Sequence, residues 1–232
     1  MAMNGDYRRR MLTQSYWPAD TGQPLLDWTL GQALRHSADL APDRAALVEG
    51  LPAGEPHRRW TFAELQAGAE RVAAALLTRF RPGERVAVWA ANTPEWQLIF
   101  YGCALAGIVM VTVNPAYKAG ETEYVLEKSG AAGLFAMDSY RGYDAETAVA
   151  SIRPRLPALR EVIRIADFEA FAASGAAGAA LPDVAPEEAC VIMFTSGTTG
   201  RQKGVIFNHR GVINMANFTQ ARGGLARGGV FV

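Results

Sequence analysis

The stretch IMFTSGTTGRQKGVIFNH, residues 192–209, consists of two apolar runs separated by a polar segment rich in glycine. The first run ends at Phe194 and the second begins at Val205. Short apolar runs bounded by turn-forming residues are typical of buried strands. The stretch therefore predicts a strand, a polar glycine loop and a second strand.

The loop between these strands has the composition of an anion-binding site. Gly197, Gly200 and Gly204 allow positive φ angles, so that successive backbone N–H groups can converge on one anion. Hydroxyl groups and one ammonium group add further donors. These belong to Thr195, Ser196, Thr198, Thr199 and Lys203. We interpret the loop as a polyphosphate-binding element, and the alternative is a hydroxyl-rich hairpin turn with a solvated lysine.

The spacing of the loop excludes two common nucleotide-binding motifs. In the P-loop pattern GxxxxGK(S/T), the lysine directly follows a glycine and directly precedes a hydroxyl residue. Here Gln202 precedes Lys203, and Gly204 follows it. The dinucleotide-binding pattern GxGxxG cannot be placed on these glycines either. A P-loop kinase or GTPase is therefore excluded.

Residues 195–204, TSGTTGRQKG, resemble the phosphate-binding signature of the adenylate-forming superfamily. This superfamily includes acyl-CoA synthetases, luciferases and the adenylation domains of peptide synthetases, and its usual pattern is (S/T)SG(S/T)TGxPKG. The chain departs from the pattern at Gln202, which replaces the usual proline. Because proline would stiffen the backbone, we expect glutamine to make the approach to Lys203 more mobile without removing a donor.

Two earlier segments are similar to further motifs of the same superfamily. Residues 60–65, WTFAEL, and residues 105–115, LAGIVMVTVNP, occur in the family's order and at about its spacing ahead of the loop. Residues 86–96 and 113–117, VAVWAANTPEW and VNPAY, look most like the fatty acyl-CoA synthetase branch. The three motifs together make the resemblance specific.

Predicted strands and helices alternate between residues 45 and 171. Thr61 and Glu64 form a capping-box pattern at the start of the most regular helical periodicity. The uncharged stretch 96–117 contains polar residues and glycines, so we expect a buried helix and a buried strand there rather than a membrane span. The alternation predicts an α/β fold with a parallel, helix-covered sheet and right-handed crossovers. The resemblance implies that this fold is similar to the N-terminal domain of acyl-CoA synthetases.

The domain organisation follows from composition. Residues 1–173 are expected to form an N-terminal α/β subdomain, and residues 174–186, rich in Ala, Gly and Pro, a linker. Residues 187–232 would then hold the strand-loop-strand and a following helix, as the truncated start of a second subdomain. Members of the superfamily are longer, and the resemblance places the adenine-binding segment, the magnesium-ligating glutamate, the acyl tunnel and the catalytic lysine beyond residue 232. No catalytic residue and no metal ligand is therefore assigned in this chain.

Composition limits the partners and the location. The 23 basic and 23 acidic residues cancel, so a nucleic-acid partner is not expected. Cys103 and Cys190 stand in apolar surroundings and are interpreted as small buried residues in a reducing compartment. His36, His57 and His209 have no metal-ligand spacing. The N-terminal segment lacks the apolar run of a secretory signal, and we expect a cytoplasmic protein without a transmembrane segment.

Three residues close to the loop leave two interpretations each. His209 and Arg210 are either supports of the loop or a strand end and a helix cap, and we favour the latter. Arg201 either contacts phosphate or is solvated.

The resemblance implies a two-step ligase reaction. A carboxylic acid attacks the α-phosphorus of ATP, carried with Mg²⁺, to give an acyl-adenylate and pyrophosphate, and coenzyme A then displaces AMP. The ATP phosphates would be bound by the loop, at Thr195, Ser196, Gly197, Thr198, Thr199, Gly200 and Lys203. We expect the isolated chain to be inactive and to self-associate through its truncated surface. The alternatives are a non-catalytic nucleotide-binding or structural module, or an adenylating enzyme with an acceptor other than CoA.

Overall fold

A six-stranded sheet forms the centre of the molecule in the computed structural model. The structure describes residues 15, 22, 24–50, 57–176, 178–195, 202–223 and 228–229. In spatial order the strands are β10 (Lys203–Asn208), β9 (Ala189–Thr195), β4 (Val109–Val113), β3 (Arg85–Trp89), β5 (Gly133–Ala136) and β8 (Glu161–Arg164). The strands from β9 to β8 run parallel, and β10 runs antiparallel to β9 at the edge. The predicted α/β fold with a mostly parallel sheet is confirmed.

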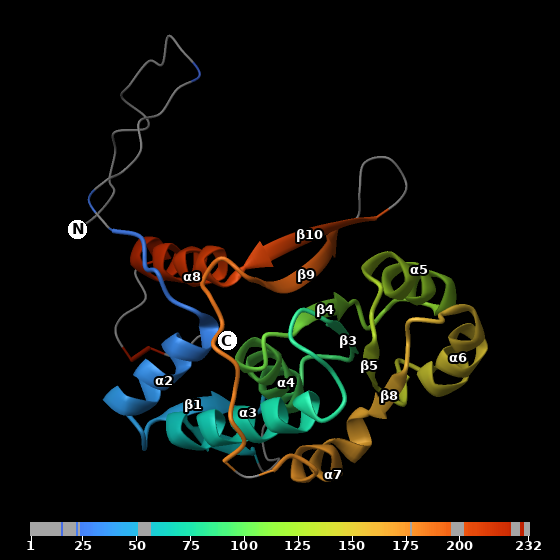
Figure 1. Ribbon diagram of the computed structural model, residues 1–232, viewed down its shortest axis with the longest axis horizontal. Coiled ribbons are helices and arrows are strands. Elements are labelled where there is room, and N and C mark those ends of the chain that lie inside the picture. The colour runs from blue at the N-terminus through green and yellow to red at the C-terminus, as the bar shows by residue number, and fades with distance from the viewer. Residues whose placement is uncertain are drawn as a thin grey trace.

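Helices cover the sheet on two sides (Figure 1). They are α2 (Leu30–Leu40), α3 (Phe62–Leu77), α4 (Pro94–Leu105), α5 (Ala119–Ser129), α6 (Ala145–Ile152), α7 (Phe168–Ala173) and α8 (His209–Gly223), with the short 3₁₀ helices η1 (Arg153–Arg155) and η2 (Ile165–Asp167). α3 contacts α2, α4 and α7, whereas α5 contacts α6. From β3 the chain moves to β4 in one direction and then to β5 in the other, so the connecting helices lie on opposite faces.

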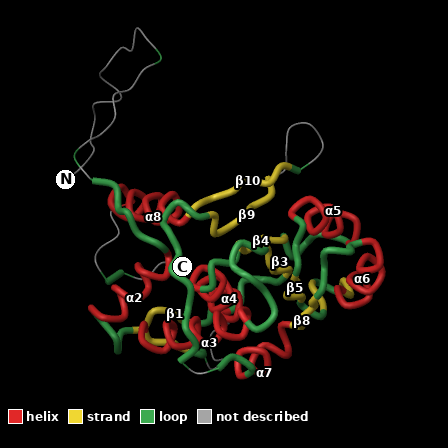
Figure 2. The backbone as a smooth tube through the Cα atoms, in the orientation of Figure 1, coloured by secondary structure: helices red, strands yellow, loops and turns green. Residues whose placement is uncertain are grey.

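Two small hairpins lie outside the main sheet (Figure 2). β1 (Ala45–Val48) pairs with β2 (Arg59–Thr61), and both segments were expected to be strands. β6 (Ser139–Tyr140) pairs with β7 (Tyr143–Asp144), which the sequence did not predict because two-residue strands have no readable period. Their turn has positive φ at Arg141 (48°) and Gly142 (79°), as in a type I′ hairpin.

The predicted capping box is confirmed, and two further helices have clear end signals. Thr61 accepts a hydrogen bond from the N–H of Glu64 at 3.2 Å, and the Glu64 carboxylate accepts from the N–H of Thr61 at 2.8 Å. Pro94 stands in the first turn of α4, and Gly130 ends α5 in the left-handed conformation with φ 62°. These local signals fix where the crossover helices start and stop.

The stretch 96–117 forms most of α4 and all of β4, as expected. α4 packs closely on α3 at Gly102, where an added Cβ would collide with the side chain of Val72 and lie 3.3 Å from the carbonyl oxygen of Ala69. Both cysteines are buried, and burial raises the pKa of the Cys190 thiol to about 11. In the described part of the chain, no helix is long and apolar enough to cross a membrane.

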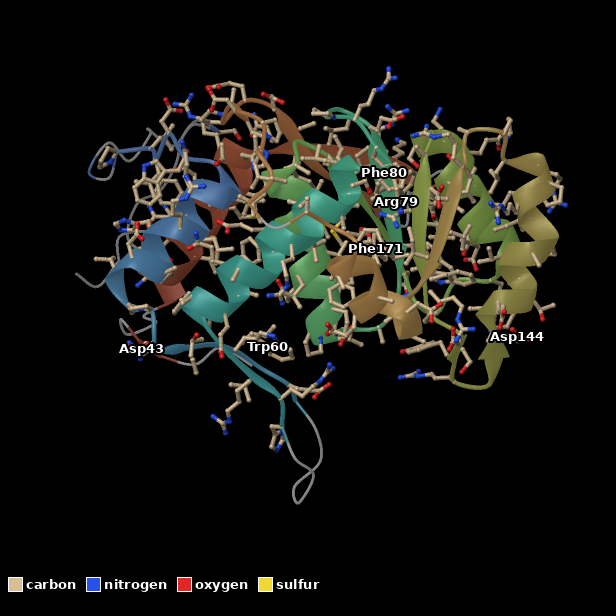
Figure 3. All side chains as sticks on the ribbon, turned by 60° about the horizontal axis from the view of Figure 1, so that its bottom comes forward. Asp43, Trp60, Arg79, Phe80, Asp144 and Phe171 are labelled. Carbon is tan, nitrogen blue, oxygen red and sulfur yellow. The ribbon has the colours of Figure 1, made fainter. Side chains whose placement is uncertain are left out.

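α7 packs against the C-terminal end of α3 through a cation–π contact. Figure 3 shows the guanidinium group of Arg79 beside Phe171, and it lies 5.0 Å from the ring centroid. Phe171 in turn meets Phe135 of β5 edge to face at 5.0 Å. The contact connects the helical layer to the centre of the sheet.

The predicted linker leads directly back to the sheet. Leu181 packs against the core, and a Cβ added at Gly107 would lie 3.4 Å from Val184. β9 then pairs with β4 from Met110 to Thr112. The division of the chain at residues 174–186 stays a prediction, and the two predicted units share one sheet.

Candidate phosphate-binding site

The predicted strand-loop-strand is the β9–β10 hairpin. The expected burial of both strands is wrong for β10, whose first four residues are exposed at the edge of the sheet, whereas Cys190, Val191 and Ile192 of β9 are buried. Register pairs Thr195 with Lys203 and Phe194 with Gly204, so the loop leaves and re-enters the sheet at facing residues. The side-chain hydroxyl of Thr195 donates to the carbonyl oxygen of Lys203 at 3.4 Å. The last residue of β9 and the first of β10 therefore mark the end of the hairpin from which the loop extends. We call this end the open end, or mouth, of the hairpin.

Two of the predicted site residues can be placed. Thr195 and Lys203 are both exposed and face one another across the open end. Among the described residues, no carboxylate forms an ion pair with Lys203. The Lys203 ammonium is a donor that suits an anion, whereas the hydroxyl hydrogen of Thr195 is used in its bond to the Lys203 carbonyl. The other predicted site residues, Ser196, Gly197, Thr198, Thr199 and Gly200, lie outside the described residues, as does Arg201.

The interpretation of Gly204 has to be corrected. It was expected to supply a positive φ angle, yet it lies inside β10 and is not among the described glycines with positive φ. A Cβ at this position would lie 3.2 Å from the side chains of Ile192 and Phe194. Gly204 is therefore suited to the close approach of the Phe194 ring across the hairpin rather than to an unusual turn.

Gln202 is held by a residue that sequence reasoning missed. The hydroxyl of Tyr124, on α5, donates to the carbonyl oxygen of Gln202 at 2.9 Å. The ring of Tyr124 also meets Phe194 edge to face, with centroids 6.3 Å apart. The Oε1 atom of Gln202 is buried and has no hydrogen-bond partner among the described residues. Tyr124 thus restrains the backbone where the superfamily usually has proline.

The base of the hairpin is fixed by α8. The side chain of Asn208 accepts from the N–H of Gly211 at 2.8 Å and caps the helix. His209 is buried, and its Nδ1 accepts from the N–H of Leu30 at 3.2 Å. Arg210 lies 3.6 Å from Asp27 in an exposed ion pair. His209 and Arg210 therefore contact the segment that leads into α2. Their roles are structural, but the strand end and the helix cap that we expected at these positions are both at Asn208.

Asn214, one turn further along α8, binds the N-terminal segment. Its side-chain amide accepts from the N–H of Leu26 and donates to the carbonyl oxygen of Leu26, both at 2.8 Å. The same amide donates to the carbonyl of Arg210 at 2.8 Å. These buried polar contacts had no signal in the sequence, because their partners are backbone groups.

Burial of His209 lowers the pKa of its imidazole to about 4, and the nearby Glu188 only partly opposes this shift. The neutral ring is needed because a protonated Nδ1 could not accept the Leu30 N–H. His209 therefore stays uncharged near neutral pH. It serves the hairpin as a buried hydrogen-bond acceptor.

The described chain has groups for a phosphate but not for a resident metal. No three His, Cys, Asp or Glu side chains lie together there in a way that could hold a metal ion. Lys203 instead offers an ammonium group where the loop re-enters the sheet, opposite Thr195. An ammonium group of this kind suits the phosphates of a nucleotide.

Comparison with known proteins identifies the family. A family model described as AMP-binding enzyme matches residues 34–230. The enzyme 3-[(3aS,4S,7aS)-7a-methyl-1,5-dioxo-octahydro-1H-inden-4-yl]propanoyl:CoA ligase of Mycobacterium tuberculosis is 37% identical over 194 residues, covering 78% of this chain and 37% of its own.

Solved structures agree with this result. The Mycobacterium tuberculosis fatty acyl CoA synthetase superposes with a TM-score of 0.68 and 28% identity, over 78% of this chain and 34% of its own. The anthranilate CoA ligase AuaEII, in complex with anthranoyl-AMP, gives a TM-score of 0.69 and 25% identity, over 82% and 35%. The chain spans only 34 to 37% of the length of these relatives. It belongs to the AMP-binding enzyme family and corresponds to the N-terminal part of its acyl-CoA ligases.

Proposed function

We propose that this chain is the N-terminal portion of an ATP-dependent, AMP-forming acyl-CoA synthetase, and that its hairpin loop binds the ATP phosphates. The observation that carries the proposal is the open end of the hairpin, where Lys203 faces Thr195. The relatives are CoA ligases by description, and one of them holds an acyl-adenylate, anthranoyl-AMP. The substrates would be a carboxylic acid, ATP with Mg²⁺, and CoA.

The first step forms a bond between a carboxylate oxygen and the α-phosphorus and breaks the bond from that phosphorus to pyrophosphate. Negative charge accumulates on the leaving pyrophosphate. Lys203, the hydroxyls of the loop and its backbone N–H groups would stabilise that charge. In the second step the CoA thiol attacks the acyl carbon, and AMP leaves. Loss of one charged donor at such a site costs about 2–4 kcal/mol at the transition state.

Lys203→Ala tests the assignment in the full-length enzyme. We expect ATP–pyrophosphate exchange to slow by about a hundredfold, because that is the kinetic equivalent of the lost stabilisation. Lys128→Ala is the matched control, since Lys128 is exposed in the last turn of α5. Circular dichroism checks that both variants fold. Wild-type exchange in Lys203→Ala contradicts the assignment.

The lysine content allows the same test on the chain itself. Its only lysines are Lys118, Lys128 and Lys203. Inorganic pyrophosphate should slow acetylation of Lys203 at least fivefold, as measured by mass spectrometry. Lys118, whose ammonium lies 3.8 Å from the centroid of the Tyr143 ring, and Lys128 should react at unchanged rates. Equal protection of all three lysines would show non-specific binding and count against the proposal.

The alternatives predict other outcomes. A non-catalytic nucleotide-binding module would protect Lys203 and form no product, and an adenylating enzyme with another acceptor would form hydroxamates from ATP and acids without making a CoA thioester. We propose a cytoplasmic location, self-association of the 232-residue chain through the exposed hairpin, and no turnover by that chain alone. Met193, Val205 and Ile206 of the hairpin are exposed apolar side chains that suit such association.

A further inference from the structure

We propose that Tyr124 is a positioning residue for the phosphate loop. It holds the two stems of the β9–β10 hairpin at the mouth, one at Phe194 near the end of β9 and the other at Gln202 just before β10. The inference rests on the proposed function, because it requires that the loop binds phosphate. Tyr124 belongs to α5, and its two contacts reach the residues on either side of the loop. It touches the stems rather than the reacting atoms.

The first contact fixes the stem that returns to the sheet. The Tyr124 hydroxyl donates to the carbonyl of Gln202 at 2.9 Å, next to Lys203 in sequence. A carbonyl held in this way limits rotation of the peptide group that joins Gln202 to Lys203. The bond therefore bears on the direction in which the Lys203 side chain leaves β10.

The second contact fixes the stem that leaves the sheet. The ring of Tyr124 meets Phe194 at an interplanar angle of 77°, and Phe194 pairs with Gly204 across the hairpin. Because Gly204 has no Cβ, the Phe194 ring can lie close to β10. One tyrosine thereby restrains Phe194, next to Thr195, and Gln202, next to Lys203.

The helix that carries Tyr124 is itself well anchored. Thr122, Val125 and Leu126 of α5 are buried, and the first N–H of the helix, at Ala119, donates to the hydroxyl of Tyr143 at 2.9 Å. A positioning residue works only on a rigid element. α5 supplies this rigidity at an otherwise exposed end of the hairpin.

Tyr124→Phe tests the inference because it removes only the hydroxyl. Tyr140→Phe is the matched control, since it removes a tyrosine hydroxyl in β6 that has no hydrogen bond to α5, β9 or β10 among the described residues. Two quantities are measured in each variant: amide hydrogen exchange at residues 194–195 and 202–204, and the Kd for inorganic pyrophosphate. Lys203→Ala is measured alongside to establish whether the loop binds pyrophosphate.

For Tyr124→Phe we expect exchange at the mouth to accelerate at least fivefold, with exchange in β3 and β5 unchanged, and the Kd to rise five- to tenfold. Tyr140→Phe should change neither quantity. The inference is overturned if mouth exchange or the Kd stays at the wild-type value, or if Tyr140→Phe has the same effects. Failure of the proposed function gives a different result: the wild type and Lys203→Ala would then bind pyrophosphate equally, and Tyr124 would have no anion to position.

Discussion

The central strands and the β9–β10 hairpin belong to one sheet but are held by different means. All residues of β5 are buried between two helical layers, whereas the first four residues of β10 are exposed. The centre is stabilised by the burial of large apolar side chains. The hairpin depends on a few directed contacts, from α8 at its base and from Tyr124 at its mouth. The comparison indicates that the centre provides stability, and we propose that the hairpin provides the binding groups.

The largest expected effect is at the centre of the sheet. Phe135→Ala in β5 removes a fully buried ring that also contacts Phe171, and we expect a loss of about 3–5 kcal/mol in unfolding free energy. Ile206→Ala in β10, where the side chain is 66% exposed, should cost less than about 0.5 kcal/mol. Denaturant unfolding measures both. Similar losses of unfolding free energy in the two variants would contradict the view that the centre, and not the hairpin, provides the stability.

A smaller effect is expected from pH at the base of the hairpin. The pKa of His209 falls from 6.5 to about 4 on folding, so between these pH values the unfolded chain binds more protons than the folded one. The contribution of His209 is complete above pH 6.5 and is lost as the pH falls toward 4. We expect a loss on the order of 2–3 kcal/mol.

His209→Asn separates this titration from that of the carboxylates. Asparagine offers the Leu30 N–H an acceptor that does not titrate. Urea unfolding at several pH values should show a weaker dependence between pH 6.5 and 4 in the variant. An identical pH dependence in both proteins would assign the acid sensitivity to other groups.

The smallest pair of effects compares two glycines. Gly102→Ala would force a Cβ against Val72 and the Ala69 carbonyl in the buried α3–α4 contact, and we expect a loss of about 1–3 kcal/mol. Gly204→Ala meets Ile192 and Phe194 at 3.2 Å in the hairpin, where a half-buried ring can move aside. Its effect should stay below about 1 kcal/mol. Thermal unfolding compares the two, and a larger loss at Gly204 would contradict the view that the hairpin yields more easily than the centre.

The sequence predicted those parts of the fold that local chemistry determines. The capping box at Thr61 and Glu64 and the helix and strand of residues 96–117 each depend on neighbouring residues, and each was found where expected. The β6–β7 hairpin was missed because strands of two residues carry no alternation. The small turn at Arg141 and Gly142 was its only signal.

The candidate site was predictable in composition but not in its supports. Hydroxyl, glycine and lysine residues next to an apolar run are visible in the letters, and Thr195 and Lys203 do face each other. Tyr124 looks like an ordinary residue of an amphipathic helix, and its partner Gln202 lies 78 residues away. The role predicted for Gly204, a positive φ angle, was wrong. Its contact with Phe194 forms only when the two strands pair, so the sequence alone could not show it.

The hydrogen bonds between α8 and the N-terminal segment determine when that segment can reach its final position during synthesis. The hydrogen bond from Leu26 to Asn214 joins residues 188 positions apart in the sequence, and the bond from Leu30 to His209 joins residues 179 positions apart. At about 5–20 residues per second, the ribosome needs on the order of 10–40 s to deliver these partners. Residues 26–30 therefore emerge long before these neighbours exist, and their contacts with α8 can form only after residues 31–208 have been made.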